Sequence, residues 1–245
     1  MSDLGDLFAQ LEAPPAPEEQ PSYAEYERDS GADPAVISLR LVGKNPLWGH
    51  LLWNAGKVSA KYVDDLGKQL EGKTVLELGA AAALPSLLAS LHAKNVVATD
   101  YPDPDLIANI QTNIDNLKAS TGRDLPITTQ GYIWGHDVQP LLNAPGQCGD
   151  KFDFLILSDV VFNHTEHDKL LETCAKTLAA DGQILVVFSP HRPKLFDKDM
   201  AFFTNAQERG FVCDEIIEKE LQPMFEEEEE TKHIRSMVYG FLLHW

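Results

Sequence analysis

The chain has 245 residues, 44% of them hydrophobic, which is enough for one full core in a single globular domain. Its formal net charge of −18 at pH 7 disfavours nucleic acid and anionic membrane surfaces as partners, because both repel an acidic protein. A basic protein or a cationic small molecule is favoured instead.

The sequence shows no signal peptide and no apolar run near the roughly 20 residues that cross a bilayer. Its three cysteines form no C-x-x-C pair, so neither a zinc ribbon nor a disulfide framework is indicated and no metal is expected. We therefore expect a cytoplasmic protein with reduced thiols, and a monomer.

Residues 1–33 are rich in acids and prolines. They hold nine acidic residues and four prolines against one base, Arg28. Such a segment buries too little apolar surface to offset the entropy of ordering, so we expect it to be mostly disordered. The spacing of the apolar residues between Leu4 and Leu11 would allow one short helix within it. The folded domain is expected to span residues 34–245.

The folded part begins with an alternating stretch, Ile37–Leu41, which suggests a strand, and a helical stretch, Trp53–Leu70. Short apolar strands then alternate with amphipathic helices. The strands are expected at Thr74–Glu77, Asn95–Thr99, Ile127–Tyr132, Phe152–Ser158, Gln183–Ser189, Phe211–Glu218 and Ser236–Leu243. The helices are expected at Pro85–His92, Pro104–Lys118, Glu166–Leu178 and Asp197–Arg209.

This alternation predicts an α/β fold with a Rossmann-like, seven-stranded, mostly parallel sheet and helices on both faces. The last two strands are separated only by a predicted loop, Leu221–Arg235. Strands joined without a crossover helix usually pair antiparallel, so the sheet should end in an antiparallel hairpin.

The segment that follows the first buried strand is typical of a nucleotide cradle. Gly79 and four alanines lead into Leu84 and Pro85, which begin a helix. A dinucleotide fingerprint would place glycines at Ala81 and Leu84, so a pyrophosphate ligand and a dehydrogenase activity are disfavoured. S-adenosylmethionine has no phosphate, and it is therefore a better ligand for this loop than a dinucleotide.

Asp100 ends the next predicted strand, 21 residues after Gly79. A carboxylate at this place can accept both ribose hydroxyls, as the acidic residue does in dinucleotide folds. The alternative is structural: Gly79 would serve a tight turn, and Asp100 would cap the helix that starts near Pro102.

Five motifs in the chain go together: NPLWGHLLWNAGK (45–57), VLELGAAAALPSL (75–87), VATDYPD (97–103), YIWG (132–135) and FLILSDVVFNH (154–164). With them, residues 36–245 resemble the class I, seven-stranded methyltransferases of the family-16 group. The resemblance implies a methyltransferase that uses S-adenosylmethionine. It also implies transfer to the N-terminal amine and a nearby lysine of a basic protein, elongation factor 1-alpha.

The resemblance also implies roles for individual residues. Cofactor contacts fall on Trp53 near the methionine part, Gly79, Ala80 and Ala81 in the cradle, Asp100 and Tyr101 at the ribose, Trp134 on the adenine and Ser158 near the reacting centre. Asp159 and Phe162 match the D-x-x-F/Y motif beside the methyl acceptor. Departing from many relatives, the cradle has alanines in place of glycines.

Structural roles compete with several of these assignments. Trp53 and Phe162 could be core residues, Trp134 could cover the sheet edge, and Asp159 could cap the following helix. The loop histidines His136, His164 and His191 are expected to face solvent.

Two other functions stay open: a small-molecule N-methyltransferase of the nicotinamide type, and a non-catalytic module that binds S-adenosylmethionine. The acidic run Glu226–Glu230 could attract a basic polypeptide or could simply be a solvated charge run.

Overall fold

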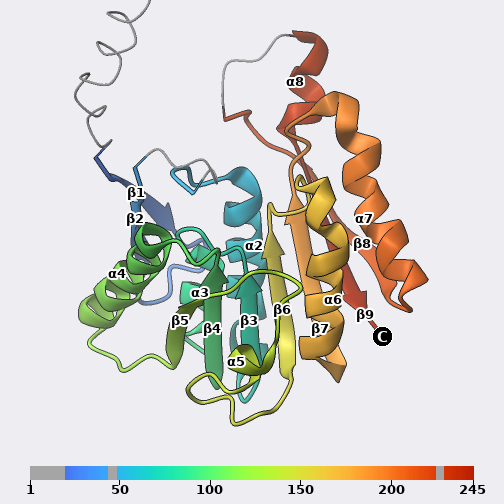
Figure 1. The fold of residues 1–245 in the computed structure, drawn as a ribbon. Helices are drawn as coiled ribbons and strands as arrows, with labels where there is room; N and C mark the ends of the chain where they lie inside the picture. Colours follow the sequence, from blue (N-terminus) through green and yellow to red (C-terminus); the bar gives the residue numbers. More distant parts are fainter. Residues whose placement is uncertain (1–19, 44–48, 225–228) are drawn as a thin grey trace, which may run out of the picture.

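The main sheet positions everything else in the molecule. The computed structural model describes residues 20–43, 49–224 and 229–245. Within them a seven-stranded sheet has the strand order β5-β4-β3-β6-β7-β9-β8 (Figure 1). Its strands are β3 (Thr74–Leu78), β4 (Asn95–Asp100), β5 (Ile127–Gly131), β6 (Phe152–Ser158), β7 (Leu178–Phe188), β8 (Val212–Glu220) and β9 (Met237–His244).

Strands β3 to β7 run parallel, and β9 pairs antiparallel with both β7 and β8. The predicted fold class is therefore confirmed, including the antiparallel hairpin at the C-terminal end. The helices are α2 (Asn54–Leu66), α3 (Leu84–Ala89), α4 (Pro104–Thr121), α5 (Gln139–Leu142), α6 (His167–Thr177), α7 (Phe196–Glu208) and α8 (Glu229–Ser236), with 3-10 turns η1 (Gly67–Leu70), η2 (His164–Glu166) and η3 (Pro193–Leu195).

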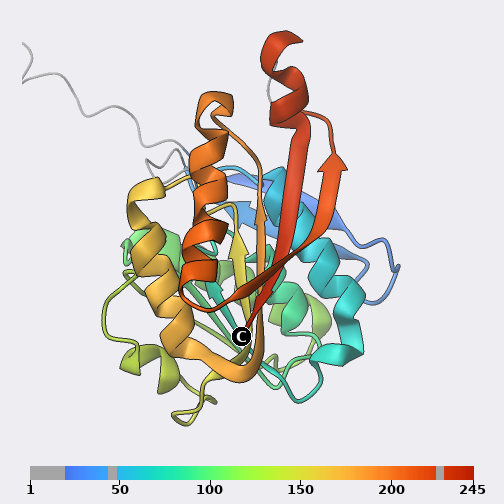
Figure 2. The same cartoon turned by 90° about the vertical axis from the view of Figure 1, so that its right-hand side faces the viewer.

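Helices cover both faces of the sheet and divide the core in two. On one face, α2, α3 and α4 pack with residues such as Val75 and Ile156. On the other face, α6 and α7 pack with Leu76 and Leu157, and Figure 2 shows these two helices across the sheet from α2. Neighbouring residues of one strand thus belong to different clusters, as the pleat of a sheet covered on both faces requires.

The segment between the last two strands differs from the prediction. We expected a plain loop over Leu221–Arg235, but α8 occupies its second half, from Glu229. Most of the acidic run Glu226–Glu230 lies outside the described residues, as does the short helix considered at Leu4–Leu11. None of the helices in the described ranges is long and apolar enough to span a bilayer.

The expectation of disorder over residues 1–33 is wrong for its described part. Strand β1 (Ser22–Glu27) pairs antiparallel with β2 (Val36–Leu41) and forms a separate two-stranded sheet. Residues 1–19 lie outside the described residues. The predicted boundary at residue 33 therefore falls inside a hairpin.

An ion pair with the main domain explains why residues 20–33, the described part of this segment, are folded. The single base in it, Arg28, is buried, and its Nε lies 3.0 Å from Asp64 Oδ1 on α2. The same guanidinium donates to the carbonyl oxygens of Ala32 and Pro34, which close the turn of the hairpin. The composition of the segment does not predict this ion pair, because Asp64 lies 36 residues further along the chain.

A second buried carboxylate holds β3 to the helix that follows it. Glu77 is fully buried in β3, and its Oε2 accepts hydrogen bonds from the backbone N–H and the hydroxyl of Ser86 in α3. Its other oxygen, Oε1, has no hydrogen-bond partner among the described residues. Burial raises the pKa of Glu77 to about 8; the Ser86 hydrogen bonds oppose this shift, and the charge of Asp100 adds to it.

Replacing Asp64 with Asn should destabilise the protein by roughly 3–5 kcal/mol, because the Arg28 charge would stay buried without its counter-charge. The matched control is Asp65→Asn on the same helix, which removes an exposed pair with Lys61. That control should cost less than about 1 kcal/mol. Urea unfolding measures both, and equal losses in the two variants would contradict the role of the Arg28 pair.

Replacing Glu77 with Gln should make the protein relatively more stable as pH rises. Between about pH 4.5 and 8 folded Glu77 keeps a proton that the unfolded chain releases, so wild-type stability falls with rising pH through this window. The limiting slope is about 1.4 kcal/mol per pH unit. Glu77→Gln lacks this contribution, so its unfolding free energy relative to wild type should rise from pH 5 to 8. A constant difference would refute the burial of an ionisable Glu77.

Candidate active site

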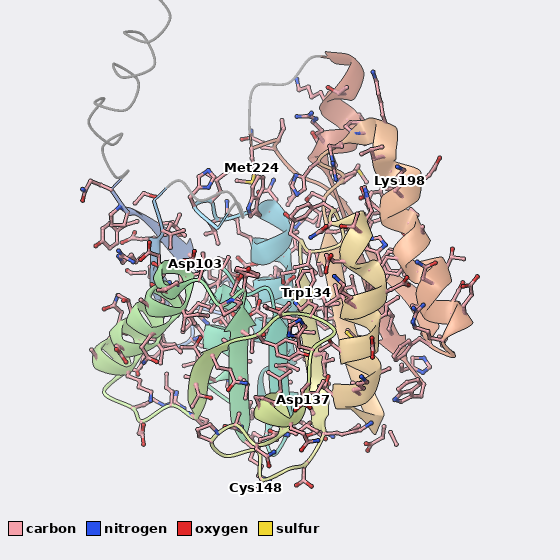
Figure 3. All side chains as sticks on the ribbon, viewed as in Figure 1. Asp103, Trp134, Asp137, Cys148, Lys198 and Met224 are labelled. Carbon is pink, nitrogen blue, oxygen red and sulfur yellow. The ribbon has the colours of Figure 1, made fainter. Side chains whose placement is uncertain are left out.

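The sheet places the predicted site residues at one edge. The carboxyl ends of β3, β4 and β6 are neighbours there, because β3 pairs with both β4 and β6. Between β3 and β6 the chain order of the sheet changes direction, which is where open α/β sheets bind ligands. Figure 3 shows Trp134 near the carboxyl ends of these strands, with Asp137 and Cys148 toward the opposite end.

The loop that leaves β3 is fixed by the end of β4. The backbone N–H groups of Gly79 and Ala80 both donate to the carbonyl oxygen of Thr99, at 2.9 Å each. Gly79 has a φ of +82°, and Ala81 and Ala83 have φ values of +50° and +61°. Alanine rarely adopts this left-handed conformation, so the tertiary contacts must hold the loop in place.

Gly79 also lies where little room is left for a side chain. A Cβ atom there would come within 2.7 Å of Val160 Cγ1 and 3.4 Å of the Trp134 ring. Three segments therefore approach each other closely at Gly79, Val160 and Trp134. Gly79 thus serves both as the tight turn and as part of the cradle, the two roles considered from the sequence. Trp134 packs beside the cradle against the second core cluster.

Asp100 connects the cradle to the end of β4. Its Oδ2 accepts the backbone N–H of Ala81, and its Oδ1 accepts that of Tyr101, each at 2.7 Å. Burial raises the pKa of the Asp100 carboxyl, while these two hydrogen bonds oppose the shift. The helix-cap alternative is wrong, because Asp103 caps α4 by accepting from Asp105 and Leu106. Tyr101 itself is largely exposed.

Two residues at the end of β6 face the same edge. The hydroxyl oxygen of Ser158 is buried and has no hydrogen-bond partner in the described part of the chain. Asp159 follows with a φ of +58°, and its N–H donates to the carbonyl of Val187 at 2.7 Å. Its side chain caps no helix; Oδ1 accepts the backbone N–H of Ser189, and Oδ2 lies 2.8 Å from His191 Nε2.

His191 gathers the acceptor-side residues into one cluster. Its ring meets Trp53 edge-on, with centroids 4.7 Å apart, and Phe162 in the same manner at 6.2 Å. Trp53 is the residue before α2 and is only partly buried. We call Trp53, Asp159, Phe162 and His191 the acceptor cluster.

The expectation that the loop histidines face solvent is correct for His136 and wrong for two others. His191 pairs with Asp159, and His164 pairs with the buried Asp199 at 2.6 Å. In the sequence, the feature that could have marked His191 as a site residue is its position just after strand β7. Its partner Asp159, however, lies 32 residues away. Only pairing of β6 with β7 brings the two together.

In the described residues, no group of three or more His, Cys, Asp or Glu side chains could hold a metal ion. The three cysteines are free.

The cradle fits S-adenosylmethionine. Asp100 presents a carboxylate at the end of β4, Trp134 offers an aromatic ring beside Gly79, and the buried Ser158 hydroxyl is left for a ligand. Gly79 approaches Val160 so closely that a Cβ on it would lie 2.7 Å from Val160 Cγ1, and Asp159 is the residue just before Val160. Donor and acceptor sites would therefore adjoin.

Comparison with known proteins agrees with this geometry. Residues 35–209 match a family model described as "Lysine methyltransferase". The chain is 52% identical to the "Protein N-terminal and lysine N-methyltransferase EFM7" of Debaryomyces hansenii, over 97% of this chain and 94% of that protein. It is 49% identical to the Candida albicans protein of the same name, over 98% and 95%.

The fold recurs in solved structures. The structure titled "A putative sam-dependent methyltransferase from Streptococcus mutans" superposes with a TM-score of 0.61 at 14% identity, over 94% of this chain and 57% of that one. At this identity the likeness concerns the fold. The family match over most of the chain and the near-full-length identity to named enzymes go further: the chain belongs to the family-16 lysine methyltransferases.

Proposed function

We propose that this protein transfers methyl groups from S-adenosylmethionine to the N-terminal amine and a nearby lysine of elongation factor 1-alpha. The observation that supports the proposal is the close approach of Gly79 to Val160, the residue after Asp159: a Cβ built on Gly79 would lie 2.7 Å from Val160 Cγ1. The names of the relatives support protein amines as acceptors. The net charge of −18 favours a basic protein as substrate.

On the donor side, the residues bind and orient. S-adenosylmethionine supplies a methyl group already activated on a sulfonium, so the protein mainly needs to align it and exclude water. Asp100 would accept hydrogen bonds from the ribose, with Tyr101 beside it, and Trp134 would pack on the adenine. Ser158 and Trp53 would lie toward the methionine part, and the Gly79–Ala81 backbone would line the cradle.

On the acceptor side, the task is to hold an amine and to free its lone pair. The Asp159 carboxylate can orient an ammonium group, and the aromatic faces of Trp53 and Phe162 can attract it, by about 0.5–2 kcal/mol. An α-amine has a pKa of about 8 and a lysine of about 10.4. At pH 7 roughly a tenth of the α-amine is neutral, against less than a thousandth of the lysine.

The assay that tests this proposal uses labelled S-adenosylmethionine with recombinant elongation factor 1-alpha in one reaction and nicotinamide in another. We expect label in the protein, on its N-terminal peptide and on a lysine by mass spectrometry. We expect the N-terminal amine to react faster at pH 7, because more of it is neutral. Label in nicotinamide alone would support the small-molecule alternative, and label in neither would overturn the proposal.

Replacing Asp100 with Asn should weaken binding of S-adenosylhomocysteine about 10- to 100-fold, because hydrogen bonds to a charged group contribute about 1.5–3 kcal/mol. Asp103→Asn is the matched control, since asparagine also caps helices well and Asp103 lies three residues away. Isothermal titration should show near wild-type affinity for the control. Equal affinity in the two variants would remove Asp100 from the ribose site.

A further inference from the structure

His191 is the titratable side chain of the acceptor cluster to which the proposed function so far gives no chemical role. It hydrogen-bonds Asp159 Oδ2 through Nε2, and its ring makes edge-on contacts with the rings of Trp53 and Phe162. Its side chain keeps 29% of its surface exposed, whereas that of Asp159 keeps 7%. The imidazole is therefore the more accessible member of the pair.

Asp159 is poorly suited to take a proton from an amine. Both of its oxygens already accept hydrogen bonds, from Ser189 N–H and from His191. An imidazole titrates near neutral pH, where a general base works best.

We propose that His191 is the base that receives the proton of the acceptor ammonium, and that Asp159 orients the ring and stabilises the imidazolium. This inference rests on the proposed function, because a base is needed only if the acceptor is a protonated amine. With Nε2–H donated to Asp159, Nδ1 carries the lone pair, and none of the described residues forms a hydrogen bond with it. The arrangement is the one in which a carboxylate fixes the tautomer of a histidine base.

The proton and electron count is simple. The ammonium R–NH3⁺ gives one proton to His191 Nδ1 and becomes R–NH2. Its nitrogen lone pair then forms a bond to the methyl carbon as the carbon–sulfur bond breaks, with the electron pair staying on the sulfur. The product R–NH2⁺–CH3 leaves, His191 returns its proton to solvent, and a further methylation would repeat the same steps.

The surroundings of His191 favour its charged form. Burial lowers its pKa, but the hydrogen bond that the ring donates to Asp159 and the charge of that carboxylate outweigh burial, so the net pKa is raised. Asp199 adds to the increase, and Arg235 opposes it. The charge of Asp159 thus makes His191 a stronger base, and activity should fall as acid protonates the ring in advance.

The test compares His191→Gln with wild type on recombinant elongation factor 1-alpha, from pH 6.5 to 9. At pH 7 we expect kcat to fall by about 100-fold or more with little change in KM. The loss of kcat in His191→Gln should shrink by about tenfold for each pH unit, up to the pKa of the amine. The reason is that the fraction of neutral amine rises with pH even when no base is present. A merely structural role would give a loss that is independent of pH.

The matched control is His244→Gln. His244 forms a His–Asp pair with Asp214, 3.3 Å apart, where β9 pairs with the start of β8, away from the acceptor cluster. It should keep wild-type kcat and pH profile. An independent readout is an NMR titration of the His191 ring in the protein without cofactor. The pKa of this ring should be lower in Asp159→Asn than in wild type.

The outcomes separate the two proposals. If wild type methylates elongation factor 1-alpha and His191→Gln keeps its rate and pH profile, the role of His191 is refuted and the proposed function stands. If wild type methylates only nicotinamide, whose ring nitrogen carries no proton at neutral pH, or labels neither compound, both proposals fall. An unchanged His191 titration in Asp159→Asn would refute the role of Asp159 as its partner.

Discussion

The hydrogen bonds from the cradle to the end of β4 are the constraint on which the site depends. Thr99 accepts two N–H groups and Asp100 a third, so the end of β4 holds the loop after β3 at three backbone N–H groups. This path puts two alanines into left-handed conformations and brings Gly79 against Val160. The neighbouring strands β4 and β6 thereby shape the loop that β3 supplies.

The same constraint explains how the cradle can hold alanines in the left-handed conformation. A left-handed alanine costs free energy, of order 1 kcal/mol or more, that the surrounding contacts must offset. Asn113 of α4 contributes by donating to the Ala82 carbonyl and to that of Arg40 in β2. The N-terminal hairpin is therefore connected to the cradle through one amide side chain.

Two ion pairs involve buried side chains and connect elements of the fold. Arg28 and Asp64 fasten the hairpin to α2, and Asp159 and His191 join the ends of β6 and β7. Glu77 differs, since among the described residues it accepts only from the hydroxyl and amide of Ser86, and burial raises its pKa to about 8. A carboxyl of this kind beside a cationic ligand would ionise more readily, because an opposite charge favours the charged form.

The sequence by itself determined the α/β class, the parallel sheet and the cradle, because strand and helix periodicities and the Gly79–Pro85 loop are local features. It also indicated Asp100 and Asp159 as the acids that follow strands. The β1 strand, the partner of Arg28 and the role of His191 depended on the tertiary structure. The Arg28–Asp64 pair, which fastens the β1–β2 hairpin to α2, joins residues 36 positions apart, and the Asp159–His191 pair joins residues 32 positions apart; no local pattern records such contacts.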